Sequence, residues 1–311
     1  MSMKVQSASL DVPGGCPNHC KFCVTELWKK GDLPMLKNAF DFKSDDFEWI
    51  KKAFRERLIY LRQHDVDTIV LTGSASEAIF NKKYLELFQE VNESIGNDKF
   101  INIELQTSGV GLMENFLFLE DVGVKTISLS MASLDTDTNF EIMQTPEKFR
   151  TWDIVEICKA VKEAGFNLRL SLNMNLEGFK EYEKSKSEDF WHGKYSDLIE
   201  ICQRLGADQV TFRKLYSTGE DGDVTSWIKR NQMDHFEPDW WEQLSQYIKK
   251  FGRPLNRLPF GAMKYSISNM STVVDEDCMA KEGAKEDLKY MILRRNCRLY
   301  SEWDDPASLI F

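Results

Sequence analysis

The chain has 311 residues, of which 42% are apolar, and it carries a formal net charge of −10 at pH 7. This length allows one large α/β domain or one domain with an appendage, and no apolar run is long enough to cross a bilayer. The acidic balance argues against a broad nucleic-acid-binding surface, which is normally basic, but it leaves room for a local basic groove.

The seven cysteines are an odd number without the spacing of a disulfide framework, and no secretory signal stands at the N-terminus. Free cysteines favour a reducing compartment, so we expect a cytoplasmic protein without membrane contact.

The first predicted strand covers residues 4–12, where apolar and polar side chains alternate. Gly14 and Gly15 then permit a tight turn into the segment CPNHCKFC at residues 16–23. It sets Cys16, Cys20 and Cys23 at the spacing C-x3-C-x2-C. A [4Fe-4S] cluster takes four thiolate ligands, so three cysteines on one loop leave one iron open to a bound molecule.

A zinc ion is the alternative for this loop. Cys16, Cys20, Cys23 and His19 form a Cys3His set that is known for structural zinc sites. Such sites usually pair two short ligand clusters, and the sequence has no second cluster at zinc-like spacing. The spacing therefore favours an iron–sulfur cluster.

The octapeptide resembles the signature of the radical S-adenosylmethionine (radical SAM) superfamily, including the aromatic residue before the third cysteine. The resemblance implies that the open iron chelates S-adenosylmethionine (SAM) and that an electron from the cluster cleaves SAM to methionine and a 5'-deoxyadenosyl radical. It also implies that Phe22 lies near the adenine of SAM.

A helix is predicted from Asp45 or Asp46 to about residue 63, and a buried β-branched strand at residues 66–71. The strand ends in the segment TGSASE at residues 72–77. The family often has a Gly-Gly-Glu-Pro-like turn here, which holds the amino group of SAM. The resemblance therefore assigns Gly73, Ser74 and Glu77 to SAM, although Ser and Ala replace glycines. A solvated carboxylate at a helix start is the alternative for Glu77.

Strand-like and helical segments alternate through residue 216, which predicts a parallel sheet. After the first two strands, the further strands are expected at residues 100–109, 124–132, 167–175 and 208–216. The helices between them are expected at residues 82–95, 112–122, 152–164 and 195–205. Six strands before residue 217 resemble the family's partial (β/α)6 TIM-type barrel, so we expect an α/β fold.

Four of these strands alternate polar with apolar side chains, whereas a strand covered on both faces reads as continuously apolar. One face must take the helices, and the other must line a polar lumen, where charge is costly unless paired or solvated. An exposed sheet face is the alternative. The resemblance places SAM contacts at Ser171 and Asn173, with Ser130 a further candidate. Three further candidates for contacts with either SAM or substrate, which the sequence does not distinguish, are Glu104, Gln106 and Arg213.

After residue 217 the alternation of strands and helices stops. We expect a radical SAM core at residues 1–217 and a small α+β extension at residues 218–311 that closes the barrel and shapes the substrate pocket. The extension has only Cys278 and Cys297, too few for a second cluster. Their role is open.

The function predicted from the resemblance is abstraction of a hydrogen atom from a substrate by the 5'-deoxyadenosyl radical. An electron donor of low potential, of the flavodoxin or ferredoxin type, is the expected partner. A small molecule or nucleotide is favoured as substrate over a peptide or nucleic acid, because the sequence shows no separate recognition module. A catalytically inert zinc- or cluster-binding protein of the same fold is the alternative from another class.

Overall fold

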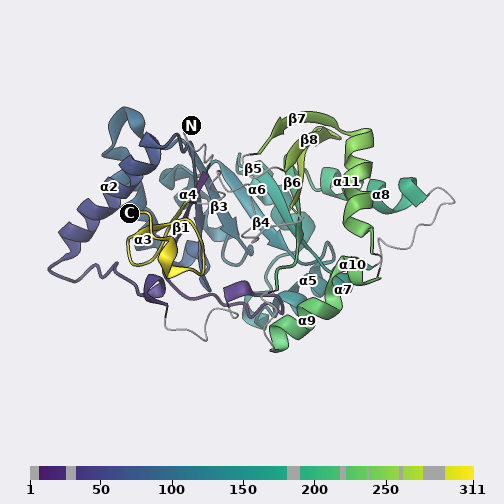
Figure 1. The fold of residues 1–311 in the computed structure, drawn as a ribbon, viewed down its shortest axis with the longest axis horizontal. Helices are drawn as coiled ribbons and strands as arrows, with labels where there is room; N and C mark the ends of the chain where they lie inside the picture. Colours follow the sequence, from purple (N-terminus) through teal and green to yellow (C-terminus); the bar gives the residue numbers. More distant parts are fainter. Residues whose placement is uncertain are drawn as a thin grey trace.

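A computed structural model describes residues 7–25, 33–180, 190–217, 222–236, 238–258, 262–275 and 291–311, with residues 190–194 and 236 described by their backbone alone. Within these ranges the chain forms one curved sheet with helices on its outer side (Figure 1). The predicted α/β class is confirmed.

The first six strands are parallel and adjacent in chain order, as predicted. They are β1 (Ser7–Asp11), β2 (Thr68–Thr72), β3 (Asn102–Thr107), β4 (Thr126–Met131), β5 (Asn167–Met174) and β6 (Gln209–Lys214). The later strands are β7 (Arg253–Arg257), β8 (Met263–Ile267), β9 (Met270–Asp275), β10 (Met291–Leu293) and β11 (Leu299–Tyr300).

The C-terminal strands extend this sheet at both of its edges. The order among the described strands is β11-β10-β1-β2-β3-β4-β5-β6-β9-β8-β7, with β10 parallel to β1 and β9 parallel to β6. Residues of β1, β7 and β8 line one common cavity, so the two ends of the sheet curve toward each other as in a partial barrel. The extension is thus continuous with the core through its hydrogen bonds.

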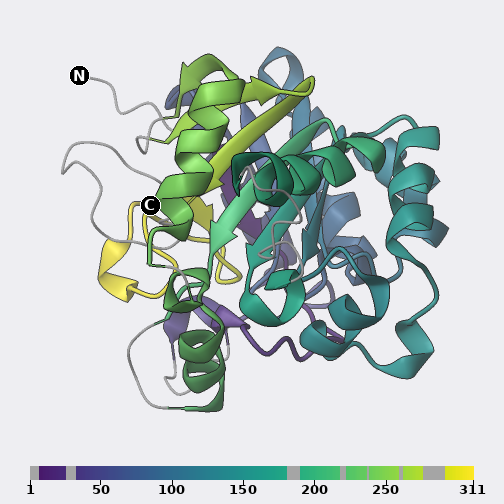
Figure 2. The same cartoon turned by 90° about the vertical axis from the view of Figure 1, so that its right-hand side faces the viewer.

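The helices follow the predicted alternation with a few additions. Those of the core are α2 (Phe47–Gln63), α3 (Lys82–Glu93), α4 (Phe116–Val122), α5 (Thr136–Met143), α6 (Ile154–Glu163), α7 (Leu176–Phe179) and α8 (Phe190–Arg204). Those of the extension are α9 (Asp223–Asn231), α10 (Met233–Phe236) and α11 (Trp240–Phe251). Figure 2 shows α11 beside the strands of the extension, where it contacts β8 and β9.

Side-chain caps explain where several helices begin. The Asn81 side chain accepts a hydrogen bond from the Tyr84 backbone N–H at the start of α3, and Asp135 accepts one from the Thr138 N–H at the start of α5. Such caps satisfy donors that have no partner inside the helix, and each contributes about 1 kcal/mol. Helix α5 was missed in the sequence because only eight residues carry it and its apolar face is weak.

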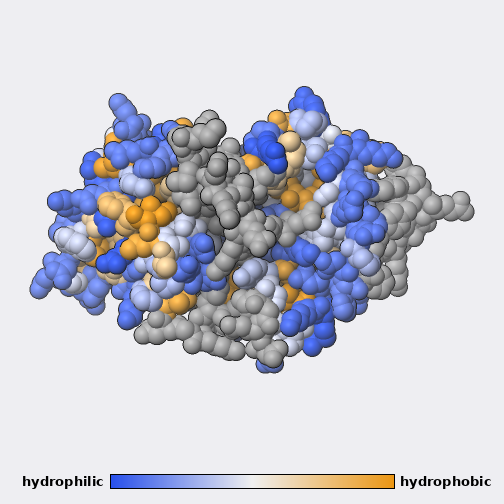
Figure 3. All heavy atoms as spheres, in the orientation of Figure 1, coloured by the Kyte–Doolittle hydropathy of each residue, from blue (hydrophilic) through white to orange (hydrophobic). Residues whose placement is uncertain are grey.

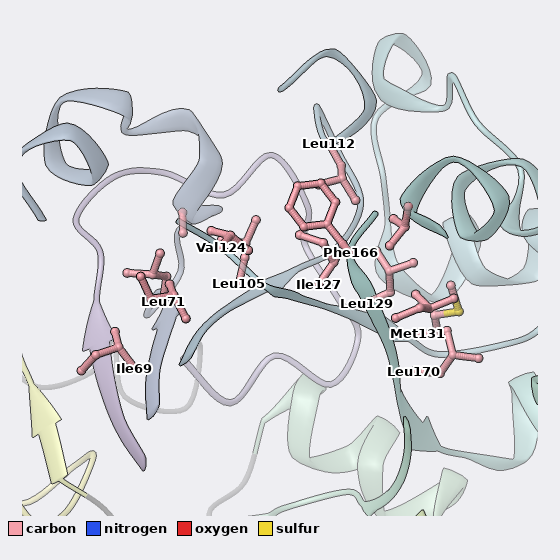
Figure 4. Close-up of a cluster of buried hydrophobic side chains, with 14 of the residues drawn as sticks. Ile69, Leu71, Leu105, Leu112, Val124, Ile127, Leu129, Met131, Phe166 and Leu170 are labelled. Atoms are coloured by element: carbon pink, nitrogen blue, oxygen red, sulfur yellow. The ribbon is translucent and has the colours of Figure 1, made fainter. Parts of the chain in front are cut away.

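The apolar faces of the strands form the core with the helices, as the alternation predicts. Figure 4 shows this cluster, with side chains from β2, β3, β4 and β5 in contact between sheet and helices. Leu105, Ile127 and Leu170 are fully buried, and burial of such a side chain contributes roughly 1.5–3 kcal/mol. The opposite, polar faces of the same strands are therefore free to line the lumen.

Candidate functional site

The cysteine loop leaves the carboxyl end of β1, where parallel barrels place their chemistry. The backbone N–H of Lys21 donates to the carbonyl of Ile142 at 3.0 Å, which fixes the loop to α5. On the other side the Phe22 ring lies 6.1 Å from the Trp227 ring of α9. The loop is thus held between one helix of the core and one of the extension.

The three cysteines of the loop are partly exposed, and none forms a disulfide bond with another described cysteine. Burial, and then the neighbouring Cys23 and Cys16, raise the pKa of Cys20 well above its ordinary value. No group of three metal-binding side chains among the described residues converges on a single ion. The thiolates of a [4Fe-4S] cluster each bind a different iron and need no common centre. Bound iron would also remove the repulsion between neighbouring thiolates.

A cavity of about 320 Å³ lies against this loop. It brings together eleven of the thirteen predicted site residues: Cys16, Cys20, Phe22, Cys23, Gly73, Ser74, Glu77, Gln106, Ser130, Asn173 and Arg213. The two others lie elsewhere. Ser171 is buried beside Ser130 in the sheet and lines no described cavity, and Glu104 lines a second cavity.

Glu77 is almost completely buried at the wall of the cavity, with 4% of its surface exposed. Its Oε2 accepts hydrogen bonds from the Ser108 backbone N–H at 2.9 Å and from the Ser108 hydroxyl at 2.6 Å. Its Oε1 is buried without a hydrogen-bond partner among the described residues. Burial raises the pKa of Glu77, and hydrogen bonds from Ser108 and from the Thr107 side chain oppose this effect. A cationic group in the cavity would complete the hydrogen bonding of Oε1.

The turn before Glu77 contains Ser and Ala at positions where a glycine-rich turn has Gly, and Ala75 adopts an unfavourable backbone conformation there. Ala75 has a φ of +52°, in the left-handed region that residues other than Gly, Asn and Asp rarely adopt. Gly73 is different, because a Cβ there would lie 1.8 Å from the Ser76 Oγ and 2.9 Å from the Ser76 carbonyl oxygen. The close approach of the chain therefore requires glycine at Gly73, whereas Ala75 holds a strained conformation.

Two arginines of the C-terminal hairpin brace this turn. Asp11, fully buried, accepts a hydrogen bond from the Ser74 N–H at 2.7 Å, and its carboxylate lies 3.2 Å from Arg294 and 3.3 Å from Arg295. Arg294, also fully buried, donates to the Ser74 hydroxyl at 2.8 Å. Arg295 donates to the Ser74 carbonyl and to the Ser76 hydroxyl. All polar groups of Ser74 are therefore engaged within the protein.

Sequence reasoning missed this brace and two further residues of the cavity. Ser108 directly follows β3 and continues the polar alternation of Glu104 and Gln106, so this pattern was visible in the sequence, but nothing in the sequence paired Ser108 with Glu77. Asn18, in the cysteine loop, is 6% exposed, and both polar atoms of its side chain lack a hydrogen-bond partner among the described residues. A buried amide without partners facing a cavity indicates a ligand that would provide them.

The polar lumen continues below this cavity. A second cavity, of about 420 Å³, is lined by β1, β2, β3, β5 and β6 and by the extension, and it shares Ser9, Gln106 and Arg213 with the first. Glu104 lies here, with its Oε2 2.5 Å from the Arg169 guanidinium. Figure 3 shows that the described surface over α2 and over β7 and β8 is mostly hydrophilic, with separate hydrophobic patches.

Of the two cysteines of the extension, Cys297 is buried, and its thiol donates a hydrogen bond to the Ile50 carbonyl at 3.9 Å, whereas Cys278 lies outside the described residues. Arg295, Asn296 and Cys297 form the turn of the antiparallel hairpin β10–β11. No helix in the described ranges combines the length and the apolarity needed to cross a membrane.

The chain is 24% identical over 192 residues to a GTP 3',8-cyclase of Rhizobium leguminosarum bv. trifolii, which covers 62% of this chain and 50% of the relative. A GTP 3',8-cyclase of Aquifex aeolicus is 22% identical over 183 residues, covering 59% of this chain and 52% of the relative. The chain spans about half the length of the curated relatives it matches. No family model matches it.

Among solved structures, Streptococcus suis SuiB bound to the precursor peptide SuiA superimposes with a TM-score of 0.52 at 14% identity, over 97% of this chain and 60% of that chain. At this identity the likeness concerns the fold. Core and extension both take part in it, since nearly the whole chain is covered.

Proposed function

We propose that the protein, as a member of the radical SAM superfamily, is an enzyme that binds a [4Fe-4S] cluster and SAM at the cysteine loop and abstracts a hydrogen atom from a substrate. The observation that carries the proposal is the orphaned Oε1 of Glu77, buried at the wall of the cavity that the three cysteines also line. Cysteine ligands and a carboxylate for the SAM amino group are the two parts that such a site needs.

Cys16, Cys20 and Cys23 would hold three irons of the cluster, and the fourth iron would stay open to SAM. Glu77 would accept a hydrogen bond from the SAM ammonium, an acceptor role for which an ionised carboxylate is suited. When bound, the cluster and SAM supply a low-potential electron and a 5'-deoxyadenosyl radical that takes a hydrogen atom from a substrate carbon. Catalysis of this kind leaves binding and orientation to the protein.

The other predicted SAM residues take supporting parts in this proposal. Gly73 lets the turn approach the cavity, and Ser130 and Asn173 present polar groups from the neighbouring strands. Phe22 and Met143 form an apolar part of the wall of this cavity, which limits the access of water to it. Ser171 has no place in the cavity, so we expect it to support Ser130 within the sheet.

We propose a flavodoxin- or ferredoxin-type electron donor, a cytoplasmic and oxygen-sensitive protein, and a small molecule or nucleotide as substrate. The relatives named GTP 3',8-cyclase support a nucleotide, while the SuiB likeness is one of fold. The division into a core at residues 1–217 and a pocket-shaping extension at residues 218–311 belongs to the same proposal. Its support is that β7 and β8 line the second cavity together with core strands.

The test is anaerobic reconstitution with iron and sulfide, followed by addition of SAM and dithionite and assay of 5'-deoxyadenosine. We expect about four irons per chain and formation of 5'-deoxyadenosine. The triple variant Cys16→Ala, Cys20→Ala, Cys23→Ala should lose both. Cys158→Ala, in the buried face of α6, is the control that removes a cysteine remote from the loop.

Two outcomes would reject the proposal. Stoichiometric zinc without sulfide would assign the loop to a structural metal. Full iron uptake by the triple variant would show that the cluster, if any, binds elsewhere. If iron binds but 5'-deoxyadenosine does not form, a SAM titration separates a missing substrate from a turn that no longer holds SAM.

A further inference from the structure

The second cavity raises the question of which substrate group it receives. We infer that Glu104 accepts a hydrogen bond from a donor-bearing polar group of the substrate, an N–H or an O–H, inside the lumen. This inference rests on the proposed function and specifies the substrate side of the same site.

The position of the cavity suits a substrate that must reach SAM. The second cavity shares Ser9, Gln106 and Arg213 with the first cavity, which lies against the cysteine loop. A molecule in the second cavity therefore has one end next to the proposed cofactor site. Glu104 lines the second cavity and not the first, whereas the three cysteines and Glu77 line the first cavity and not the second. The structure thus separates Glu104 from the SAM contacts, a distinction that the sequence leaves open.

The hydrogen bonding of Glu104 is incomplete. The side chain is 3% exposed, and its Oε2 is paired with Arg169 at 2.5 Å. Its Oε1 is buried and has no hydrogen-bond partner among the described residues. An ionised carboxylate has only acceptor capacity. The group that completes this site must therefore be a donor, because buried polar atoms in proteins are generally hydrogen-bonded.

The neighbouring cations do not favour an acceptor-only anion at this point. Arg169 donates through Nε to the Gln209 side chain at 2.9 Å and through a second nitrogen to the same oxygen, in addition to its pair with Glu104. Its guanidinium is thereby committed to protein partners. Lys264 of β8 lies on the same wall, and burial followed by the charge of Arg169 lowers its pKa. A substrate with an acceptor group beyond its donor group would engage Lys264 as well.

The test uses crystals of the full chain with cluster and SAM, soaked separately with guanidinium chloride, ethylene glycol and sodium acetate. The first probe presents cationic N–H groups, the second neutral O–H groups, and the third only acceptors. We expect guanidinium or ethylene glycol within hydrogen-bond distance of Oε1, and which of the two binds distinguishes an N–H from an O–H substrate. Acetate at Glu104, or no probe there, would overturn the inference.

Variants keep the test independent of folding and of the proposed function. Glu104→Gln should lose the donor probe by at least fivefold in occupancy, and Glu104→Asp, which keeps the charge but withdraws the carboxylate, should do the same. Glu86→Gln, exposed on α3, is the control. Cluster content and SAM affinity should stay within twofold in all three, and their loss in Glu104→Gln alone would overturn the inference. If the wild-type chain binds neither cluster nor SAM, the proposed function fails instead.

Discussion

Replacing Arg294 by Met tests whether the C-terminal hairpin holds the turn that carries Glu77. The guanidinium is fully buried, donates to the Ser74 hydroxyl at 2.8 Å, and lies 3.2 Å from the Asp11 carboxylate. Met keeps much of the volume of the side chain and removes its charge. Asp11 would then stay buried with less compensation, and Ser74 would lose one of its three anchors.

The expected loss of stability follows from the contacts that Asp11 keeps in the variant. Removal of one partner of a buried ion pair costs about 3–5 kcal/mol. Asp11 retains the Ser74 N–H at 2.7 Å and the Arg295 Nε at 3.3 Å, so we expect the lower limit, about 3 kcal/mol of unfolding free energy. We also expect SAM affinity to fall about tenfold, equivalent to about 1.4 kcal/mol, because the turn must be re-formed on binding.

Stability is measured by urea unfolding of the cluster-free chain, and SAM affinity by titration of the reconstituted chain. Arg298→Met is the matched control, since Arg298 lies in the same hairpin and is exposed. A double-mutant cycle with Asp11→Asn separates the pair from general destabilisation, and residues in contact should couple by at least about 0.5 kcal/mol. Equal effects of Arg294→Met and Arg298→Met, or additivity in the cycle, would refute the reasoning.

Four further predictions concern the same cavity. Glu77→Gln should weaken SAM binding at least tenfold, which corresponds to about 1.4 kcal/mol of binding free energy, and should leave the iron content unchanged. If the variant and the wild-type chain bind SAM with equal affinity, Glu77 has a structural role only. Burial raises the pKa of Glu77, so SAM affinity should fall as pH drops through that raised pKa. In the SAM-free protein the folded state keeps this proton longer than the unfolded state, so stability should decrease as pH rises from the unfolded pKa to the folded pKa, and Glu77→Gln should remove this slope. Gly73→Ala should cost about 1–3 kcal/mol in urea unfolding because its Cβ collides with Ser76, whereas Ala75→Gly should stabilise by up to about 1 kcal/mol by relieving its positive φ; the opposite signs would contradict the described turn. Asn18→Leu should keep the cluster but lower its midpoint potential, since hydrogen bonds to the sulfurs tune that potential; an unchanged potential in a redox titration followed by electron paramagnetic resonance would show that Asn18 does not contact the cluster.

The parts of the fold that depend on local periodicity could be predicted from the sequence. Ile103 and Leu105 alternate with Glu104 and Gln106, and this pattern alone indicates one face for helices and one for a lumen. The cysteine spacing was equally local. These features need no knowledge of which distant residues meet.

The parts that depend on distant contacts could not be predicted. Arg294 and Asp11 lie far apart in the sequence, and no local pattern around either residue indicates that they form an ion pair. The unpartnered Oε1 of Glu77 could not be predicted either, because only the structure shows that Ser108 donates both of its hydrogen bonds to Oε2. Helix α5 was missed because its packing against the cysteine loop, rather than its own apolar pattern, explains its place.

The pairing of β1 with β10 has a consequence for the synthesis of the protein. Ala8 pairs with Met291, so during synthesis this edge of β1 stays uncovered until β10 has left the ribosome. Contacts between such distant segments form slowly, because a long loop must close before they stabilise the chain. Until then the edge of β1 can pair with other chains. We therefore expect C-terminal truncations before β10 to aggregate during expression, although every residue of the cysteine loop is present in them.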